Sequence, residues 1–335
     1  MAHNIETMAW TGDRPWHGLG IEVSPDLTPA EMQEAAQLDW TVSKRPAYTL
    51  NEAEWHDKVG VMVAEGHHFI TRDSDNTILS HCGDDYVPIQ NSEIFDFFKK
   101  FTDAGHMTME TAGSLRNGSE VWGLAKIAAD FELAGGDEVK GYLLINQPHI
   151  AGKAMVIKFT PIRVVCNNTL TMALQDGGAA FRMPHIREFD MDVRRAAEEA
   201  LGLSAARVQE FKEQAEFLSS KQFNGDSLTN YIAELYQPQL FVDRAKASND
   251  DEFIMREKFN ATADKVLAAV DLSPGATLKS SKGTWWGALN GVTYIEDHHR
   301  RGNSEGNSLH SAWFGAGANR KAKALAKAIE YAEAA

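Results

Sequence analysis

The spacing of apolar residues predicts a β-rich first half of the chain. Alternating apolar and polar positions predict four short strands, at residues 41–50, 59–64, 67–71 and 77–82. A second run of the same kind covers residues 107–115, 120–131, 138–146 and 153–159. The Asn117-Gly118 pair between the first two of these segments is typical of a type I′ hairpin turn. Both runs are therefore predicted to form antiparallel sheet.

Helical spacing predicts helices between and after these strands. Thr28 and Pro29 begin a short helix that ends near Leu38, and Ser92 begins another with a wide apolar face. Residues 190–272 are predicted to be helical throughout, and so are residues 284–299 and 319–334. Between the two halves, Thr160-Pro161 predicts a short helix at residues 162–166.

This order of elements predicts an α+β fold. It has an antiparallel or mixed β-sheet, with a β-meander plus helix core, followed by a helical C-terminal half. Three regions are expected within one structural domain: a β-rich core with an N-terminal arm at residues 1–189, a helical region at 190–272, and a C-terminal helical segment at 273–335 that packs back on the core.

The composition is that of an ordinary globular protein. The 335 residues are 43% hydrophobic and 24% charged, enough for a large buried core. No apolar window is long enough for a membrane span and the first residues do not resemble a signal peptide, so we expect a cytoplasmic protein without a membrane partner. Two cysteines far apart in sequence, Cys82 and Cys166, indicate neither a disulfide framework nor a metal motif.

The net charge of −14 argues against a protein that coats nucleic acid through overall basicity. Lysine and arginine nevertheless gather in two segments. Residues 277–335 hold eight basic against five acidic residues, and residues 141–190 hold five against three. Such segments favour an anionic ligand, or they are two ordinary surfaces of mixed charge.

Most candidate ligand-binding residues lie near the C-terminus. Small residues in Gly315-Ala-Gly-Ala-Asn319 come before Arg320 and Lys321 at a predicted helix start, where backbone amides and cations bind phosphate. The alternative is a glycine turn that lets the helix pack closely. The adjacent His298 and His299 diverge on a helix and make a poor metal site, so Arg300 and Arg301 after them either complement the helix dipole or contact phosphate.

Aromatic residues interleave with these cations. Single-stranded nucleic acid binds in cationic grooves with aromatic platforms for its bases, which makes Trp286 and Trp313 candidates for stacking, with burial in a core as the alternative. The second basic segment adds candidates on strand edges. The predicted nucleic-acid-binding residues are Arg163, Arg182, Arg187, Arg300, Arg301, Arg320, Lys321, Trp286 and Trp313.

No catalytic signature accompanies these residues. The sequence has no Gly-x-Ser-x-Gly elbow and no Walker ending after the glycine turn, and its paired carboxylates Asp84-Asp85 and Asp250-Asp251 are adjacent and diverge. We therefore assign no catalytic residue, cofactor or metal, and do not expect an enzyme.

Several motifs together resemble one known family. They include Pro15-Trp-His-Gly-Leu-Gly20, Tyr86-Val-Pro-Ile-Gln-Asn91, Thr284-Trp-Trp-Gly-Ala-Leu-Asn290, Asp297-His-His-Arg300 and Trp313-Phe-Gly-Ala-Gly317. In combination they are similar to the phage/plasmid-like proteins of domain-of-unknown-function family 932. The resemblance implies a phage or mobile-element setting, where DNA replication, recombination and evasion of host defence are common tasks.

The leading hypothesis is a homo-oligomer that binds single-stranded DNA and anneals it in recombination, with phage or host recombination proteins as further partners. A β-meander followed by a helix is also the core of phage single-strand annealing proteins, although fold alone does not determine function. One alternative is an acidic protein-interaction factor that mimics DNA or blocks host defence. Another is a phosphate-ester enzyme that uses the glycine turn with His298 or His299.

Overall fold

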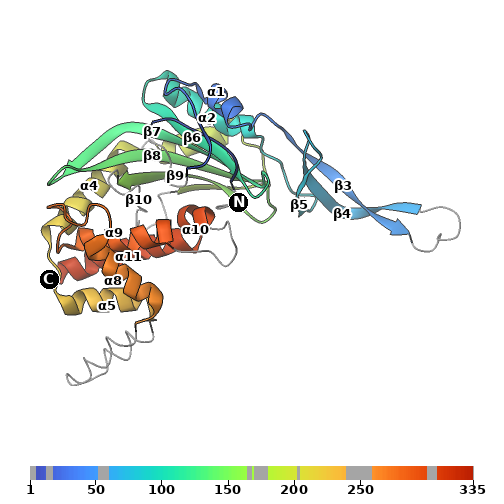
Figure 1. The fold of residues 1–335 in the computed structure, drawn as a ribbon. Coiled ribbons are helices and arrows are strands. Elements are labelled where there is room, and N and C mark those ends of the chain that lie inside the picture. The colour runs from blue at the N-terminus through green and yellow to red at the C-terminus, as the bar shows by residue number, and fades with distance from the viewer. Residues whose placement is uncertain are drawn as a thin grey trace. The chain divides into compact units, whose positions relative to one another are not determined.

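The fold is α+β, as predicted. The computed structural model describes residues 5–12, 18–51, 60–163, 168–169, 180–201, 204–238, 259–299 and 308–334 (Figure 1). The chain forms two compact units. The first contains Met1–Ala128, Tyr142–Phe159 and Gly178–Leu203, and the second contains Ala129–Gly141, Thr160–Gly177 and Ser204–Ala335. This division places residues 129–141, the tip of one β-hairpin, with the C-terminal helices.

The main sheet has the strand order β10-β9-β8-β7-β6-β1-β2, with β11 paired to β9. The predicted β6–β7 hairpin is confirmed, and Arg116 and Asn117 both have positive φ angles, 55° and 54°. The strands are β1 (Ile5–Trp10), β2 (Ile21–Glu22), β6 (Met107–Leu115), β7 (Glu120–Leu133), β8 (Asp137–Pro148), β9 (Ala154–Arg163), β10 (Asn168–Thr169) and β11 (Ala180–Pro184).

A smaller antiparallel sheet has the order β3-β4-β5, so the predicted meander is confirmed. Its strands are β3 (Val42–Asn51), β4 (Gly60–Arg72) and β5 (Ile78–Cys82). The predicted break at Glu65-Gly66, between the segments 59–64 and 67–71, is wrong. Gly66 adopts a φ of 76° inside one continuous strand, at a place where the β3–β4 register shifts, so the chain passes through without reversing.

Helices α1 (Pro29–Ala35) and α2 (Asn91–Asp103) pack on strand β6, close to each other (Figure 1). Thr28 caps α1 through a capping box with Glu31, as its sequence indicates. The apolar face of α2 buries Ile94 and Phe98 completely. Gly123 in β7 allows this approach, because a Cβ atom there would lie 2.8 Å from the Phe98 ring.

The helices of the second unit surround α9. All residues from Trp285 to Thr293 are buried, and α9 contacts α4, α8 and α11. Over Trp285–Thr293, helix α9 therefore has no side that faces solvent. No helix in the described ranges is long and apolar enough to cross a membrane. The remaining helices are α3 (Met191–Leu201) in the first unit, then α4 (Ser204–Ser220), α5 (Gly225–Tyr236), α8 (Ala261–Leu272), α9 (Trp285–Tyr294), the π-helical turn η5 (Ile295–His299), α10 (Ser308–Phe314) and α11 (Ala316–Glu333).

The predicted helix at residues 162–166 is wrong in its described part. Strand β9 continues through Arg163, and Ile162 pairs with Thr169 of β10. The Thr-Pro pair thus lies within a strand, because pairing with β10 outweighs the local tendency of Pro161 to begin a helix. Residues 164–167 lie outside the described ranges.

Gly287 provides a test of the packing of α9. We expect Gly287→Ala to destabilise the protein by about 2 kcal/mol, because the new Cβ would lie 2.0 Å from the backbone oxygen of Ser281. Alanine normally stabilises a helix relative to glycine, so the sign would be reversed. Denaturant unfolding measures the effect. Gly83→Ala, whose Cβ would be 3.9 Å from its nearest neighbour, is the control, and equal stability of both variants would contradict the packing.

Candidate functional site

Trp286, which was expected to stack on bases, lies in the core of the second unit. Its side chain is fully buried, and its indole Nε1 donates a 2.9 Å hydrogen bond to Oδ2 of Asp137. The hydroxyl of Ser280 donates to the same oxygen over 2.6 Å, and Phe211 packs edge-on against the indole. Trp286 therefore presents no face to a base and instead stabilises a buried carboxylate.

Lys321 is also buried, and it binds Asp297 instead of facing solvent. The Nζ atom lies 2.6 Å from Oδ1 of Asp297, and the two side chains are 0% and 5% exposed. A phosphate group cannot reach this ammonium in the observed conformation. The prediction that Lys321 contacts DNA is therefore wrong, because the tertiary fold turns it toward η5.

Arg320 makes a parallel contact to the preceding acid. Its NH1 atom lies 2.9 Å from Oε2 of Glu296, whose other oxygen accepts a 2.8 Å hydrogen bond from the Tyr236 hydroxyl. The guanidinium also lies 5.4 Å from the Tyr236 ring centroid. Two successive acids of η5 thus bind two successive cations of α11, and we call these four residues the ion-pair cluster.

The glycine turn before α11 serves close packing. The Gly317 amide donates to the Ser311 hydroxyl over 3.2 Å, and a Cβ atom on Gly317 would lie 2.9 Å from the Ser311 carbonyl oxygen. These contacts support the packing interpretation of the turn. His298 and His299 both lie against Tyr294, with ring centroids 5.0 and 4.9 Å away.

Of the other predicted DNA-binding residues, those that the structure describes fall in both units. Arg182 on β11 and Arg187 just after it are exposed in the first unit, and Arg187 lies 3.5 Å from Asp190. Trp313 is half-buried in the second unit, edge-on to Phe314. Arg163 ends β9 and its side chain is not described, while Arg300 and Arg301 lie outside the described residues.

A second buried polar group lies in the first unit, around His149. Asn91 donates through Nδ2 to two backbone oxygens, so its Oδ1 accepts the 2.9 Å hydrogen bond from His149 Nε2. His149 is therefore assigned as the neutral tautomer that is protonated at Nε2. Complete burial, together with a smaller effect of nearby His185, lowers the pKa of His149 to about 3.

His185 is neutral for the same reason. Its Nδ1 donates to the carbonyl oxygen of Val87 over 3.2 Å, and its ring stacks on Tyr86 at 4.9 Å. Burial lowers the pKa of His185 and raises the pKa of Tyr86. Uncharged polar side chains therefore anchor the Tyr86–Asn91 segment against the end of β8.

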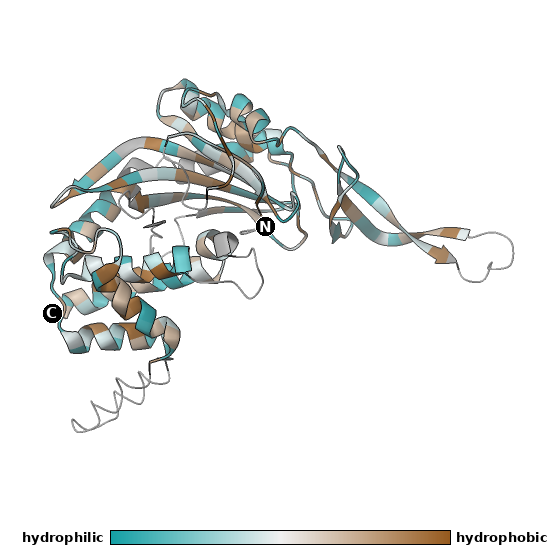
Figure 2. Cartoon of the chain, viewed as in Figure 1, coloured by the Kyte–Doolittle hydropathy of each residue, from teal (hydrophilic) through white to brown (hydrophobic). Residues whose placement is uncertain are grey.

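The β3–β4 hairpin carries an exposed apolar surface. Beyond the residues that β5 pairs with, Tyr48 lies opposite Val63 and Leu50 opposite Val61. Residues that pair directly, and residues two apart along a strand, share one face of a sheet. These four side chains are 58%, 55%, 65% and 63% exposed, respectively, and Figure 2 shows hydrophobic colour on this distal part. We call Tyr48, Leu50, Val61 and Val63 the arm face.

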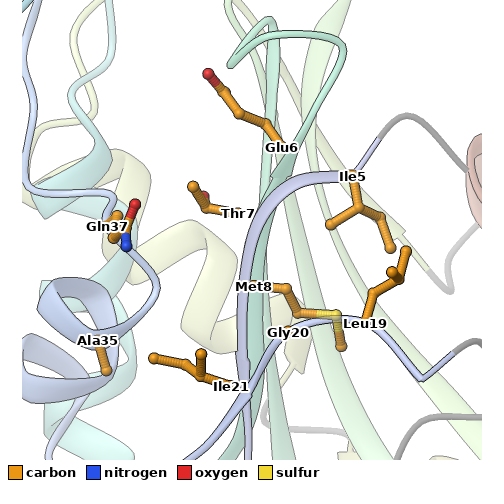
Figure 3. Close-up of a pocket in the computed structure, with 9 residues that line it drawn as sticks. All are labelled: Ile5, Glu6, Thr7, Met8, Leu19, Gly20, Ile21, Ala35 and Gln37. Carbon is orange, nitrogen blue, oxygen red and sulfur yellow. The ribbon is translucent and has the colours of Figure 1, made fainter. Parts of the chain in front are cut away.

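A shallow apolar groove lies beside β1 and β2 in the same unit. It encloses about 300 Å³, and Figure 3 shows Ile5, Met8 and Leu19 gathered along it. Ile5 and Met8 are buried, whereas Ile21 is 51% exposed at its edge. Glu6, which also lines the groove, lies 2.8 Å from Arg72 at the base of the hairpin.

Comparison with known proteins identifies the family. The model of the family described as "Domain of unknown function (DUF932)" matches residues 78–329. The chain belongs to this family. No curated protein and no solved structure matches the chain.

The DUF932 segment contains the ion-pair cluster, the Asp137–Trp286 contact and the polar group around His149. It begins at Ile78, the first residue of β5, so strands β3 and β4 with the arm face lie outside it. Among the residues whose structure is described, no three or more His, Cys, Asp or Glu side chains are placed to hold a metal ion.

Sequence reasoning missed the arm face. In a strand, Tyr48 and Leu50 alternate with polar residues as they would if they faced a core. Only the observed pairing shows that this part of the DUF932 protein has two strands, whose four apolar side chains are more than half exposed. The acids of the ion-pair cluster could have been found from the sequence, because Glu296-Asp297 and Arg320-Lys321 are adjacent pairs of opposite charge in neighbouring helices.

Proposed function

We propose that this protein acts by binding other protein chains through the arm face. The observation that carries the proposal is the exposure of four large apolar side chains on one side of a two-stranded ribbon. Such a ribbon is only marginally stable alone, and contiguous exposed apolar surface typically marks an interaction site. A protein partner would cover this surface and stabilise the ribbon.

The charge of the chain supports a protein partner over nucleic acid at the arm. The described distal residues, 48–51 and 60–63, include no charged side chain, and the chain as a whole carries −14. Binding to phosphates depends on lysine and arginine. In the second unit, Arg320, Lys321 and Lys327 are engaged with acidic side chains, which leaves less positive surface than the sequence suggested.

Photo-crosslinking in cells tests the proposal. The full chain carries p-benzoylphenylalanine in place of Leu50, and we expect ultraviolet light to convert it into one or a few discrete protein adducts. The control places the same residue at the exposed position Asp103 on α2. Adducts at position 50 no stronger than those at position 103 would refute an arm-mediated function.

A second candidate is the binding of single-stranded DNA by an oligomer, with annealing as the outcome. The observation in its favour is Arg182, which is exposed on β11 and shares a strand face with Lys158 of β9, since Arg182 pairs with Val156 and Ala180 with Lys158. Two cations along one face at the end of a sheet form a short phosphate-binding track. Recombination proteins of a phage or of its host would be the partners.

Arg182→Ala tests the DNA proposal. Removing one phosphate contact is expected to weaken binding of a fluorescently labelled oligonucleotide of arbitrary sequence several-fold. It should also reduce the slope of log affinity against log salt by about 0.7. Fluorescence anisotropy with single-stranded DNA measures both. Lys282→Ala, an exposed cation of the second unit, is the control. Absence of binding by the wild-type protein at low salt would rule this candidate out.

A further inference from the structure

We infer that His67 and His81 form a binding site for a divalent transition-metal ion such as Zn²⁺ on the small sheet of the first unit. The Nδ1 atom of His67 lies 3.0 Å from the Nε2 atom of His81, and the two ring centroids are 5.1 Å apart. Both residues are exposed, so an ion with its water can reach the two nitrogens from solvent. Neither histidine belongs to the arm face, and this site is independent of the proposed function.

The two nitrogen atoms are spaced almost as two imidazole ligands of one ion are. Zinc–nitrogen bonds of about 2.0–2.1 Å in a tetrahedral site place two ligand nitrogens about 3.3 Å apart. The observed 3.0 Å is shorter by only about 0.3 Å, a difference that small rotations of two exposed rings remove.

Without an ion, this contact is a hydrogen bond in which one ring donates and the other accepts. An ion takes the lone pairs of both facing nitrogens. The proton of the donating ring then moves to the opposite nitrogen of the same imidazole, so both rings stay neutral. Exchanging the hydrogen bond for the ion therefore requires no change in the charge of either histidine.

A bulge in β4 determines the position of His67. The register between β3 and β4 shifts here, so that residues 64–67 of β4 lie opposite Ala47 alone. Gly66 has a φ of 76°, a backbone conformation that favours glycine. Regular pairing with both neighbouring strands resumes at His68. Bulges re-aim side chains and are common next to functional sites, and this one ends at the residue that meets His81.

The second ring is held by a regular part of the sheet. His81 pairs with Phe69 across β4 and β5, and the Phe69 ring packs edge-on against it, with centroids 6.1 Å apart and an interplanar angle of 68°. His67 precedes Phe69 by two residues and so belongs to the same face. Ligands carried by paired strands are positioned more precisely than ligands on loops, which lowers the ordering cost of binding.

The ligand chemistry selects the class of ion. Imidazole nitrogen suits Zn²⁺, Cu²⁺ and Ni²⁺, whereas Mg²⁺ and Ca²⁺ prefer oxygen ligands. The described residues supply no group of three His, Cys, Asp or Glu for a metal, so water completes the coordination of an ion on this pair. Such an ion keeps open positions for a further ligand. It also joins β4 to β5 just before the distal part of the β3–β4 hairpin.

Isothermal titration calorimetry with Zn²⁺ tests the site, on the full chain without a polyhistidine tag. We expect the wild type to bind Zn²⁺, and His67→Gln and His81→Gln each to weaken this binding more than about tenfold. Glutamine can keep a hydrogen bond between the strands without supplying an imidazole, and circular dichroism checks that the fold is retained. His106→Gln, an exposed position after α2, is the matched control and should bind Zn²⁺ like the wild type.

The double variant distinguishes one shared site from two separate contacts. If both rings hold one ion, the second substitution costs almost nothing once the first imidazole is gone, so His67→Gln/His81→Gln should bind like either single variant. Losses that add up in the double variant, or an equal loss in His106→Gln, would mean adventitious binding to surface histidines only and would overturn the site. Absence of Zn²⁺ binding by the wild type at about 1 mM would also overturn it.

Discussion

Asp297→Ala is expected to destabilise the protein by about 3–5 kcal/mol. The substitution removes the carboxylate that lies 2.6 Å from the buried ammonium of Lys321 and leaves that charge without its ion-pair partner in the core of the second unit. Breaking a buried pair costs far more than the pair itself contributes. Chemical denaturation monitored by tryptophan fluorescence measures the loss.

Two further variants distinguish a buried charge from ordinary packing. Asp297→Leu combined with Lys321→Met replaces both charges with apolar groups, and we expect its stability to return to within about 1 kcal/mol of the wild type. Lys99→Ala breaks an exposed pair with Asp103 on α2 and should cost less than about 1 kcal/mol. If the double variant were as unstable as Asp297→Ala, the cost would come from lost packing and the ion-pair interpretation would be wrong.

The stability of the protein is expected to fall by about 2 kcal/mol between pH 7 and pH 5 because of His149 alone. The pKa of this buried imidazole is lowered from 6.5 to about 3 in the folded protein. Below about pH 6.5 the unfolded chain binds a proton that the folded chain does not, so each further pH unit favours unfolding until the folded pKa is reached. The lowered pKa of His185 adds to the effect in the same direction.

His149→Gln isolates this contribution, since a glutamine amide can keep the hydrogen bond to Asn91 without titrating. In urea unfolding at several pH values, the free energy of unfolding of the variant should fall by about 2 kcal/mol less between pH 7 and pH 5 than that of the wild type. His106→Gln, an exposed position after α2, is the matched control. An unaltered pH dependence in His149→Gln would show that His149 does not stay neutral in the folded state.

Much of the fold could be predicted because its signals are local. The helix start at Thr28-Pro29, the Asn117-Gly118 turn and the alternation in β6 and β7 depend on neighbours within a few residues, and all three are confirmed. The failures occurred where distant pairing outweighed a local signal. Gly66 looked like a turn and Thr160-Pro161 like a helix start, but each lies in a continuous strand that is paired with another.

The candidate site was harder to predict, because burial is a property of the whole fold. Trp286 and Lys321 look like a platform and a cation in the sequence, and both are fully buried against acids that are 149 and 24 residues away, respectively. Arg182 is exposed, as a DNA contact would require, and its function remains a prediction. The sequence cannot distinguish buried from exposed side chains here, because lysine and tryptophan occur both in cores and on surfaces.

The sequence by itself determined the α+β class, most of the strands and helices, and membership of the DUF932 family, since these follow from short-range periodicity and from motifs that can be matched residue by residue. The tertiary structure alone decided which charges are neutralised and which apolar side chains stay uncovered. Glu296 and Asp297 neutralise the cations of α11, and the arm face is left exposed where β5 no longer pairs. The physical reason is that the free energy of a charge or an apolar group depends on what surrounds it, and those surroundings come from residues far away in the chain.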